Sequence, residues 1–162
     1  MFLRLFLLLT LILSTLACKG RRDRIQVPFT AYFDIPAGLN TFLTYHFPIR
    51  VGSNGVVPIG MIDAQPSRMR MTLISGEPNF DFVRRGYMDA ILTDTTRAEM
   101  GYNLEVFLNS SQTLDLLPST VNLVDHINQD SFDIEVKLEF RGIPSATSQI
   151  RIDFSVEALV EQ

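Results

Sequence analysis

The sequence predicts an all-β domain, an antiparallel two-sheet β-sandwich of seven or eight strands with an immunoglobulin-like outline. Two observations lead to this prediction. Apolar residues recur at every second position in the clearest segments, which is the period of a strand with one buried face. Turn-forming residues separate these segments, and helical periodicity is almost absent. A partly closed barrel is the alternative architecture.

The clearest strand covers residues 132–141, where every even position is apolar and every odd position is charged. Residues 150–158 repeat the alternation, and a turn-rich segment joins the two. One interpretation is a hairpin that sets Glu139 opposite Arg151 and Lys137 opposite Asp153. The other places the two strands in different sheets.

Three more alternating segments follow from the same criterion, at residues 25–35, 42–51 and 68–73. Pro28 and Pro48 interrupt the first two. Because proline lacks an N–H group for the strand ladder, we expect the first strand at a sheet edge and the second at an edge or bulge. Weaker strand signals cover residues 87–93 and 100–108, and one helical turn is expected within 119–129.

The first eighteen residues differ from the rest of the chain. Arg4 is their only charged residue, and a leucine-rich core extends from Leu5 to Leu16. A short positive start and an apolar core of about a dozen residues are typical of a secretory signal. As a helix, residues 5–18 would reach only about 21 Å, whereas a bilayer core is about 30 Å thick. The pattern therefore favours a signal peptide over a membrane-spanning helix.

The end of this segment, Thr15-Leu16-Ala17-Cys18, resembles the lipobox of bacterial lipoproteins. The resemblance implies cleavage by signal peptidase II between Ala17 and Cys18, with diacylglycerol on the cysteine sulfur. It covers only the signal, and Thr15 stands where leucine is commonest. Cys18 is the only cysteine of the chain, so it has no intramolecular disulfide partner. Cleavage by the ordinary signal peptidase is the alternative.

The resulting organisation is a signal peptide at residues 1–17, a lipidated basic tether at 18–24 and one domain at 25–162. Membrane lipid, reached through acylated Cys18, and a protein of the cell envelope are the expected partners. The expected location is the cell envelope outside the cytoplasm, at the outer membrane of a Gram-negative bacterium. Without the signal, 13 basic residues face 18 acidic ones. This excess of negative charge disfavours nucleic acid as a partner.

No pattern of catalytic residues is recognised, so the protein is not expected to be an enzyme. His46 and His126 are the only histidines, and no nucleophile-elbow sequence accompanies them. No metal site or cofactor is predicted, because the domain has no cysteine beyond the anchor Cys18 and no phosphate-binding glycine loop occurs. A calcium loop at residues 128–133 is an alternative, but it lacks the glycine and terminal glutamate of an EF-hand.

Arg84 and Arg85 form the most visible basic cluster and are the candidate ligand-binding residues, next to Phe80 and Phe82. The alternative is a solvated strand end.

The leading functional hypothesis is a membrane-anchored envelope lipoprotein with a non-catalytic interaction or structural domain. The second is a lipoprotein that binds a glycan or an anionic ligand, with Tyr32, Phe42 and Phe107 available as exposed aromatics. A hydrolase using His46 or His126 is the third.

Overall fold

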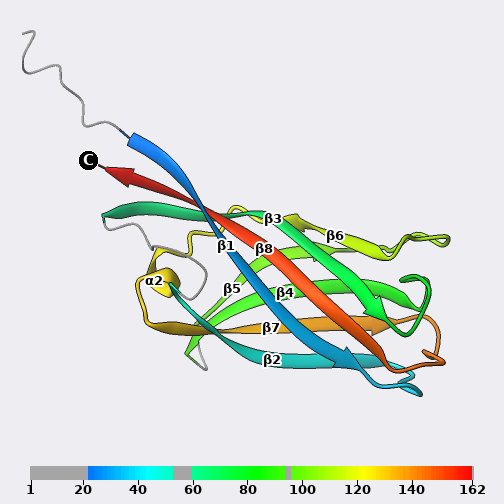
Figure 1. The fold of residues 1–162 in the computed structure, drawn as a ribbon. Coiled ribbons are helices and arrows are strands. Elements are labelled where there is room, and N and C mark those ends of the chain that lie inside the picture. The colour runs from blue at the N-terminus through cyan, green and yellow to red at the C-terminus, as the bar shows by residue number, and fades with distance from the viewer. Residues whose placement is uncertain (1–21, 53–59, 94–95, 162) are drawn as a thin grey trace, which may run out of the picture.

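The computed structural model describes residues 22–52, 60–93 and 96–161. Eight strands and one short helix occur in this part of the chain (Figure 1). In chain order they are β1 (Arg22–Ile35), β2 (Phe42–Arg50), β3 (Met61–Ser75), β4 (Val83–Thr93), β5 (Thr96–Asn103), β6 (Thr113–Pro118), α2 (Val124–Ile127), β7 (Ser131–Phe140) and β8 (Ser148–Glu161). None of the helical residues described forms a helix long and apolar enough to cross a membrane.

All eight strands belong to one antiparallel sheet with the order β1-β8-β3-β6-β5-β4-β7-β2. The sheet curls into a half-barrel, so that the β1 end lies across the β7 and β2 end (Figure 1). The two edge strands approach each other at Phe33 and Tyr45, whose ring centroids are 5.4 Å apart. The predicted all-β, antiparallel class and strand number are confirmed. The predicted division into two immunoglobulin-like sheets is not confirmed.

The core lies inside the curl and is built from the apolar faces of the alternating strands. Phe29 of β1 stacks on Phe154 of β8 with centroids 4.9 Å apart. It also meets the edge of Phe132 of β7, across the interior, at 6.1 Å. Ile134 and Ile152 are fully buried in the same layer. Each such side chain contributes about 1.5–3 kcal/mol by leaving water, which explains why the alternation dictates which face points inward.

The predicted hairpin between the two clearest strands is wrong. β7 pairs with β2 and β4, whereas β8 pairs with β1 and β3. Lys137 therefore lies opposite Thr44 and Tyr87 rather than opposite Asp153. Alternation fixes the face of each side chain, but charges on several strands offer equally good cross-strand partners, so it does not fix the neighbouring strand.

The prolines were informative about strand position. Pro28 lies in β1 and Pro48 in β2, and these are the two edge strands of the sheet, as predicted. Pro66 lies in β3, which has neighbours on both sides. There the pairing with β8 shifts register between Pro66 and Arg68, so this proline is accommodated at a β-bulge.

Several strands differ in extent from the sequence-based prediction, and β3, β4 and β8 are longer than expected. β1 begins at Arg22, before the predicted start at residue 25, and β5 covers 96–103 rather than 100–108. β6 was not predicted, because it is short and its exposed Leu117 breaks the alternation of Leu114 and Leu116. The predicted helical turn within 119–129 is confirmed as α2.

Candidate anion-binding groove

The predicted lipidation site, Ala17 and Cys18, lies outside the described residues, and its processing stays a prediction. The predicted ligand-binding pair lies within them. A register shift between Val83 and Arg85 marks a bulge in β4 at this pair. Arg85 forms an ion pair with Glu139 at 3.6 Å and donates a hydrogen bond to the Leu104 carbonyl at 3.2 Å. Arg84 is exposed and lines a separate hollow beside Glu105 and Arg141. The two arginines therefore have different surroundings.

The two histidines also lie in different environments. His46 is on the outer face of β2, where Nε2 lies 2.9 Å from Oε2 of Glu135. His126 lies in α2, is buried, and meets Phe132 edge to face with ring centroids 6.0 Å apart. The described residues include no group of three or more histidine, cysteine or acidic side chains that could hold a metal ion.

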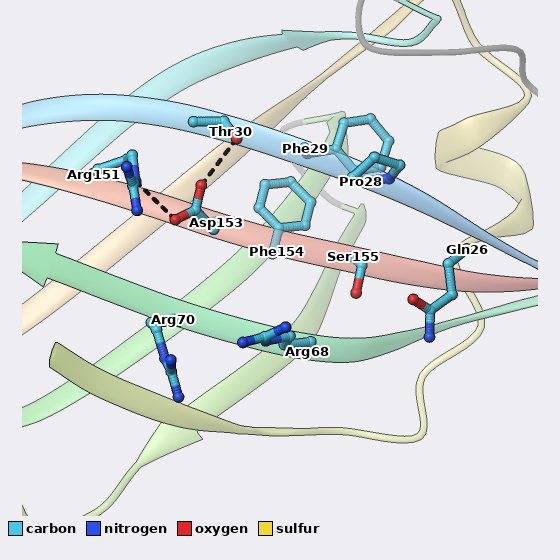
Figure 2. A pocket seen from close by; sticks show the side chains of 10 residues that line it. All are labelled: Gln26, Pro28, Phe29, Thr30, Arg68, Arg70, Arg151, Asp153, Phe154 and Ser155. Carbon is cyan, nitrogen blue, oxygen red and sulfur yellow. Dashed lines mark hydrogen bonds and ion pairs between the residues drawn. The ribbon is translucent and has the colours of Figure 1, made fainter.

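A shallow groove of about 380 Å³ crosses the outer face of β1, β8 and β3 (Figure 2). Its position follows from the sizes of the paired side chains. Pro28 of β1 lies opposite Ser155 of β8, and Ser155 lies opposite Arg68 of β3. Pro28 and Ser155 are small, so this row of the sheet is lower than its neighbours. The lining residues are Gln26, Pro28, Phe29, Thr30, Arg68, Arg70, Arg151, Asp153, Phe154 and Ser155.

The bulge in β3 shapes one wall of the groove. Pro66 and Met69 are buried, whereas the two residues between them are not, so consecutive side chains reach the outer face. Ser67 Oγ donates a hydrogen bond to the carbonyl of Ser155 at 3.2 Å and lies 2.9 Å from its hydroxyl. These contacts tie the bulge to β8 and place Arg68 beside the floor of the groove.

Two of the three arginines in the groove already have carboxylate partners. Arg70 binds Asp115 through two hydrogen bonds, of 2.6 and 3.0 Å. This hydrogen bonding lowers the pKa of Asp115, against the opposing effect of burial. Arg151 Nε lies 2.8 Å from Oδ2 of Asp153, whose other oxygen accepts a hydrogen bond from Thr30 at 3.0 Å (Figure 2).

Arg68 has no such partner. Its guanidinium makes no hydrogen bond or ion pair within the described part of the chain and lies along β3 (Figure 2), although its charge acts on Asp115 and helps to lower the pKa of that carboxyl. The groove lining contains three arginines and one carboxylate, Asp153, in a chain whose net charge is −4. A guanidinium is a strong donor to oxyanions, so this arrangement can hold a negatively charged group.

Sequence reasoning missed this site for a definable reason. The alternation of residues 68–73 was correctly predicted, and it puts Arg68 and Arg70 on the face of the strand that points away from the buried Met69 and Met71. The sequence did not show that β3 pairs with β8, which brings Arg151 alongside. Pro66 was the available signal, because a proline inside a central strand indicates a bulge.

The outer face of β7 carries a second charged cluster, centred on Glu135. This carboxylate is buried and lies 2.5 Å from Arg97 Nη1, 2.5 Å from Lys137 Nζ and 2.9 Å from His46 Nε2. Lys137 also reaches Asp89 at 3.3 Å. Burial raises the pKa of Glu135, but hydrogen bonds and charges from Lys137 and Arg97 outweigh it, so the pKa lies below its ordinary value. The cluster is closed by its own partners and leaves the carboxylate no free face for a ligand.

His126 makes stability depend on pH. Neither ring nitrogen has a hydrogen-bond partner among the described residues. Burial lowers the pKa of His126 below 6.5, and the charge of Asp125 and the backbone of Ala90 oppose this only in part. The fold therefore favours the neutral ring, and its contribution is complete above the unfolded pKa and is lost as pH falls below it.

We expect the free energy of unfolding to fall between about pH 7 and pH 5, by at most about 1.4 kcal/mol per pH unit for this one proton. His126→Leu should remove that slope, as measured by urea denaturation at both pH values. The acidic groups with a lowered pKa change the free energy of unfolding only at lower pH, below about 4.5, so they do not contribute to the slope between pH 7 and pH 5. An unchanged slope in the variant would show that His126 is not its cause.

No family model and no curated protein matches the sequence. Solved structures match it over most of its length. The decameric BFDV capsid protein aligns with 85% of this chain and 99% of its own, with 13% identity and a TM-score of 0.44. A chain of the Helicobacter pylori bacteriophage KHP30 capsid covers 88% and 100%, with 12% identity and a TM-score of 0.34. A chain of Desmodium yellow mottle tymovirus covers 89% and 91%, with 15% identity and a TM-score of 0.33.

The predicted function of a membrane-anchored envelope lipoprotein is withdrawn, since these matched chains come from viral and bacteriophage structures and lend it no support. At these identities and TM-scores no role of the matched proteins is transferred to this chain.

Proposed function

We propose that the protein is a non-enzymatic binding protein that holds an oxyanion of an extended ligand in the groove across β1, β8 and β3. The unpaired guanidinium of Arg68 is the observation that carries this proposal. A sulfate, phosphate or carboxylate group of the ligand would be the anionic partner of Arg68. Arg70 and Arg151 already have such partners in the carboxylates of Asp115 and Asp153. The groove is open and shallow, so it suits a chain lying on the sheet better than an enclosed small molecule.

The neighbouring polar groups support the same ligand class. The side chain of Gln26 lines the groove from β1 and can donate hydrogen bonds, whereas the hydroxyl of Ser155 on β8 is already bonded to Ser67. Asp153 of β8 lies opposite Thr30 of β1 and Arg70 of β3, and its charge repels an incoming anion. Affinity should therefore be moderate and should fall as salt screens the exposed charges.

We infer further that the curled sheet acts as two four-stranded layers, β1-β8-β3-β6 and β5-β4-β7-β2. β5 and β6 pair at only two positions, Gly101 with Pro118 and Tyr102 with Leu117. This narrow junction lets one sheet fold onto itself. The strand order is that of a double-sheet jelly roll rather than of an immunoglobulin-like sandwich. Jelly rolls host many functions, so the proposal rests on the groove and not on the architecture.

The test is binding of the full chain to sulfated dextran, with neutral dextran as the reference polymer, by isothermal titration calorimetry at about 0.15 M salt. Arg68→Gln should weaken binding about tenfold, the effect of losing one charge-assisted hydrogen bond. Asp153→Asn should strengthen binding, because it removes the carboxylate that competes for the groove. A merely structural role for these residues would not produce opposite effects.

Arg50→Gln is the matched control. Arg50 is also exposed and carries the same charge, but it lies on β2, outside the groove. The variant should leave affinity within about twofold of the unmodified chain. Equal binding of neutral and sulfated dextran, or a larger effect at Arg50 than at Arg68, would overturn the proposal.

A further inference from the structure

Four loops gather at one end of the half-barrel, at residues 36–41, 76–82, 104–112 and 141–147 (Figure 1). Hydrogen bonds join them to one another. Gly38 N donates to the carbonyl of Pro144 at 3.0 Å, and the carboxylate of Glu77 accepts from Ala146 N at 3.0 Å. The carboxylate of Asp81 accepts from the backbone and the hydroxyl of Ser110, each at 2.8 Å. The loop end is therefore a connected, well-fixed surface.

The segment 104–112 is fixed most firmly. Val106 N bonds to the carbonyl of Arg84 at 2.9 Å, and the Val106 side chain is buried. The carbonyls of Leu104 and Val106 accept hydrogen bonds from Arg85 and Arg141 respectively. Val106 points inward, and hydrogen bonds hold the carbonyls of Leu104 and Val106. The side chains on either side of Val106 therefore point to solvent.

The side chains displayed in this way are large and apolar. Leu104, Phe107 and Leu108 are 60%, 79% and 64% exposed, and Ile143 of the adjoining loop is 65% exposed. A single exposed leucine needs no explanation, but several on a fixed surface mark an interaction site. Because the loops are already ordered, binding there would cost little conformational entropy.

Charges beside the apolar residues indicate what the surface fits. Arg84, Arg141 and Glu105 line one hollow of about 400 Å³ next to the 104–112 loop. A patch that carries both signs around an apolar centre is complementary to a copy of itself. In a two-fold dimer a residue that lies off the axis meets a different residue of the same patch, so Arg84 can face Glu105 of the other molecule.

We propose that the loop end is a self-association surface, with a second copy of this chain as its occupant in a two-fold dimer. Phe107 is the apolar anchor, and the pair of Arg84 with Glu105 across the axis sets the orientation. This inference is independent of the anion groove, which lies on the outer face of other strands.

The test is sedimentation velocity of the full chain in a mild detergent, over a range of protein concentrations. The unmodified chain should show a concentration-dependent dimer. Arg84→Glu and Glu105→Arg should each weaken the dimer at least tenfold, because each places like charges opposite one another. An equimolar mixture of the two variants should restore it, since both charge pairs across the axis are then complementary.

Two further variants distinguish association through this surface from non-specific hydrophobic association. Phe107→Asp should leave the chain monomeric, whereas Leu117→Asp, at an exposed apolar site on β6, should change nothing. A chain that stays monomeric at every concentration overturns the proposal and leaves the loop end to a different protein. The proposal is also overturned if the charge variants dimerise as well as the unmodified chain, or if Leu117→Asp also disrupts the dimer. In either case another surface mediates the association.

Discussion

Gly76→Ala is expected to lower the free energy of unfolding by about 4 kcal/mol, a large effect for the addition of one carbon atom. Gly76 follows β3 with φ at +98°, a conformation that L-residues rarely adopt. An added Cβ would lie 2.5 Å from Ser148 Cα and 2.5 Å from the Thr147 carbonyl oxygen. Both obstacles are backbone atoms at the start of β8, so neither can move without displacing a central strand.

Gly38→Ala is the matched control, because Gly38 also has a positive φ, +84°, but no atom within 4 Å of an added Cβ. It should cost only the backbone strain, about 1 kcal/mol. Thermal unfolding followed by circular dichroism measures both variants, with a melting temperature about 10 °C lower for Gly76→Ala. Equal losses at the two sites would show that strain rather than steric exclusion dominates.

Glu135→Ala is expected to destabilise the fold by about 3 kcal/mol, the cost of removing a buried carboxylate that binds three neighbouring side chains. Removal of this carboxylate leaves Arg97, Lys137 and His46 around an empty position, with Asp89 as the remaining nearby acid. These side chains are about half exposed, so salt can screen their repulsion. Urea denaturation at low and high ionic strength should therefore show part of the loss recovered by salt.

Glu139→Ala provides the comparison for that variant, on the same face of the same strand. Glu139 is half exposed and meets only Arg85, at 3.6 Å. Its removal should cost less than about 1 kcal/mol. A similar cost at both positions would mean that burial of Glu135 contributes nothing to the effect.

The sequence predicted side-chain faces far better than strand neighbours. Alternation placed Ile134 and Ile152 in the core and His46 on the outer face, because burial of apolar surface determines the face locally. The pairing of β8 with β1 and β3 depends on contacts between residues more than 70 positions apart. No local pattern encodes such contacts, so the predicted hairpin and its charge pairs were wrong.

The candidate groove was hidden for the same reason. Each of its arginines is an ordinary outward residue of its own strand, and only the strand order brings Arg68 and Arg151 to one surface. Arg84 and Arg85 were predicted as a site because they are adjacent in the sequence. In the structure, Arg85 forms an ion pair with Glu139 and donates a hydrogen bond to the carbonyl of Leu104. Adjacency along the chain is a weak guide to a site on a sheet, where the relevant neighbours lie on other strands.

The pairing of the first strand with the last has a consequence for how the molecule is made. β1 has β8 as its only hydrogen-bonded neighbour, so Arg22 pairs with Glu161 almost a full chain length away. A ribosome releases β1 long before its partner exists. Until β8 has been synthesised, the apolar face of β1 and its backbone hydrogen-bonding groups have no partner strand. Closure of so long a loop also makes folding slow. Loss of a few residues from the end of β8 should accordingly harm β1 as much as β8 itself.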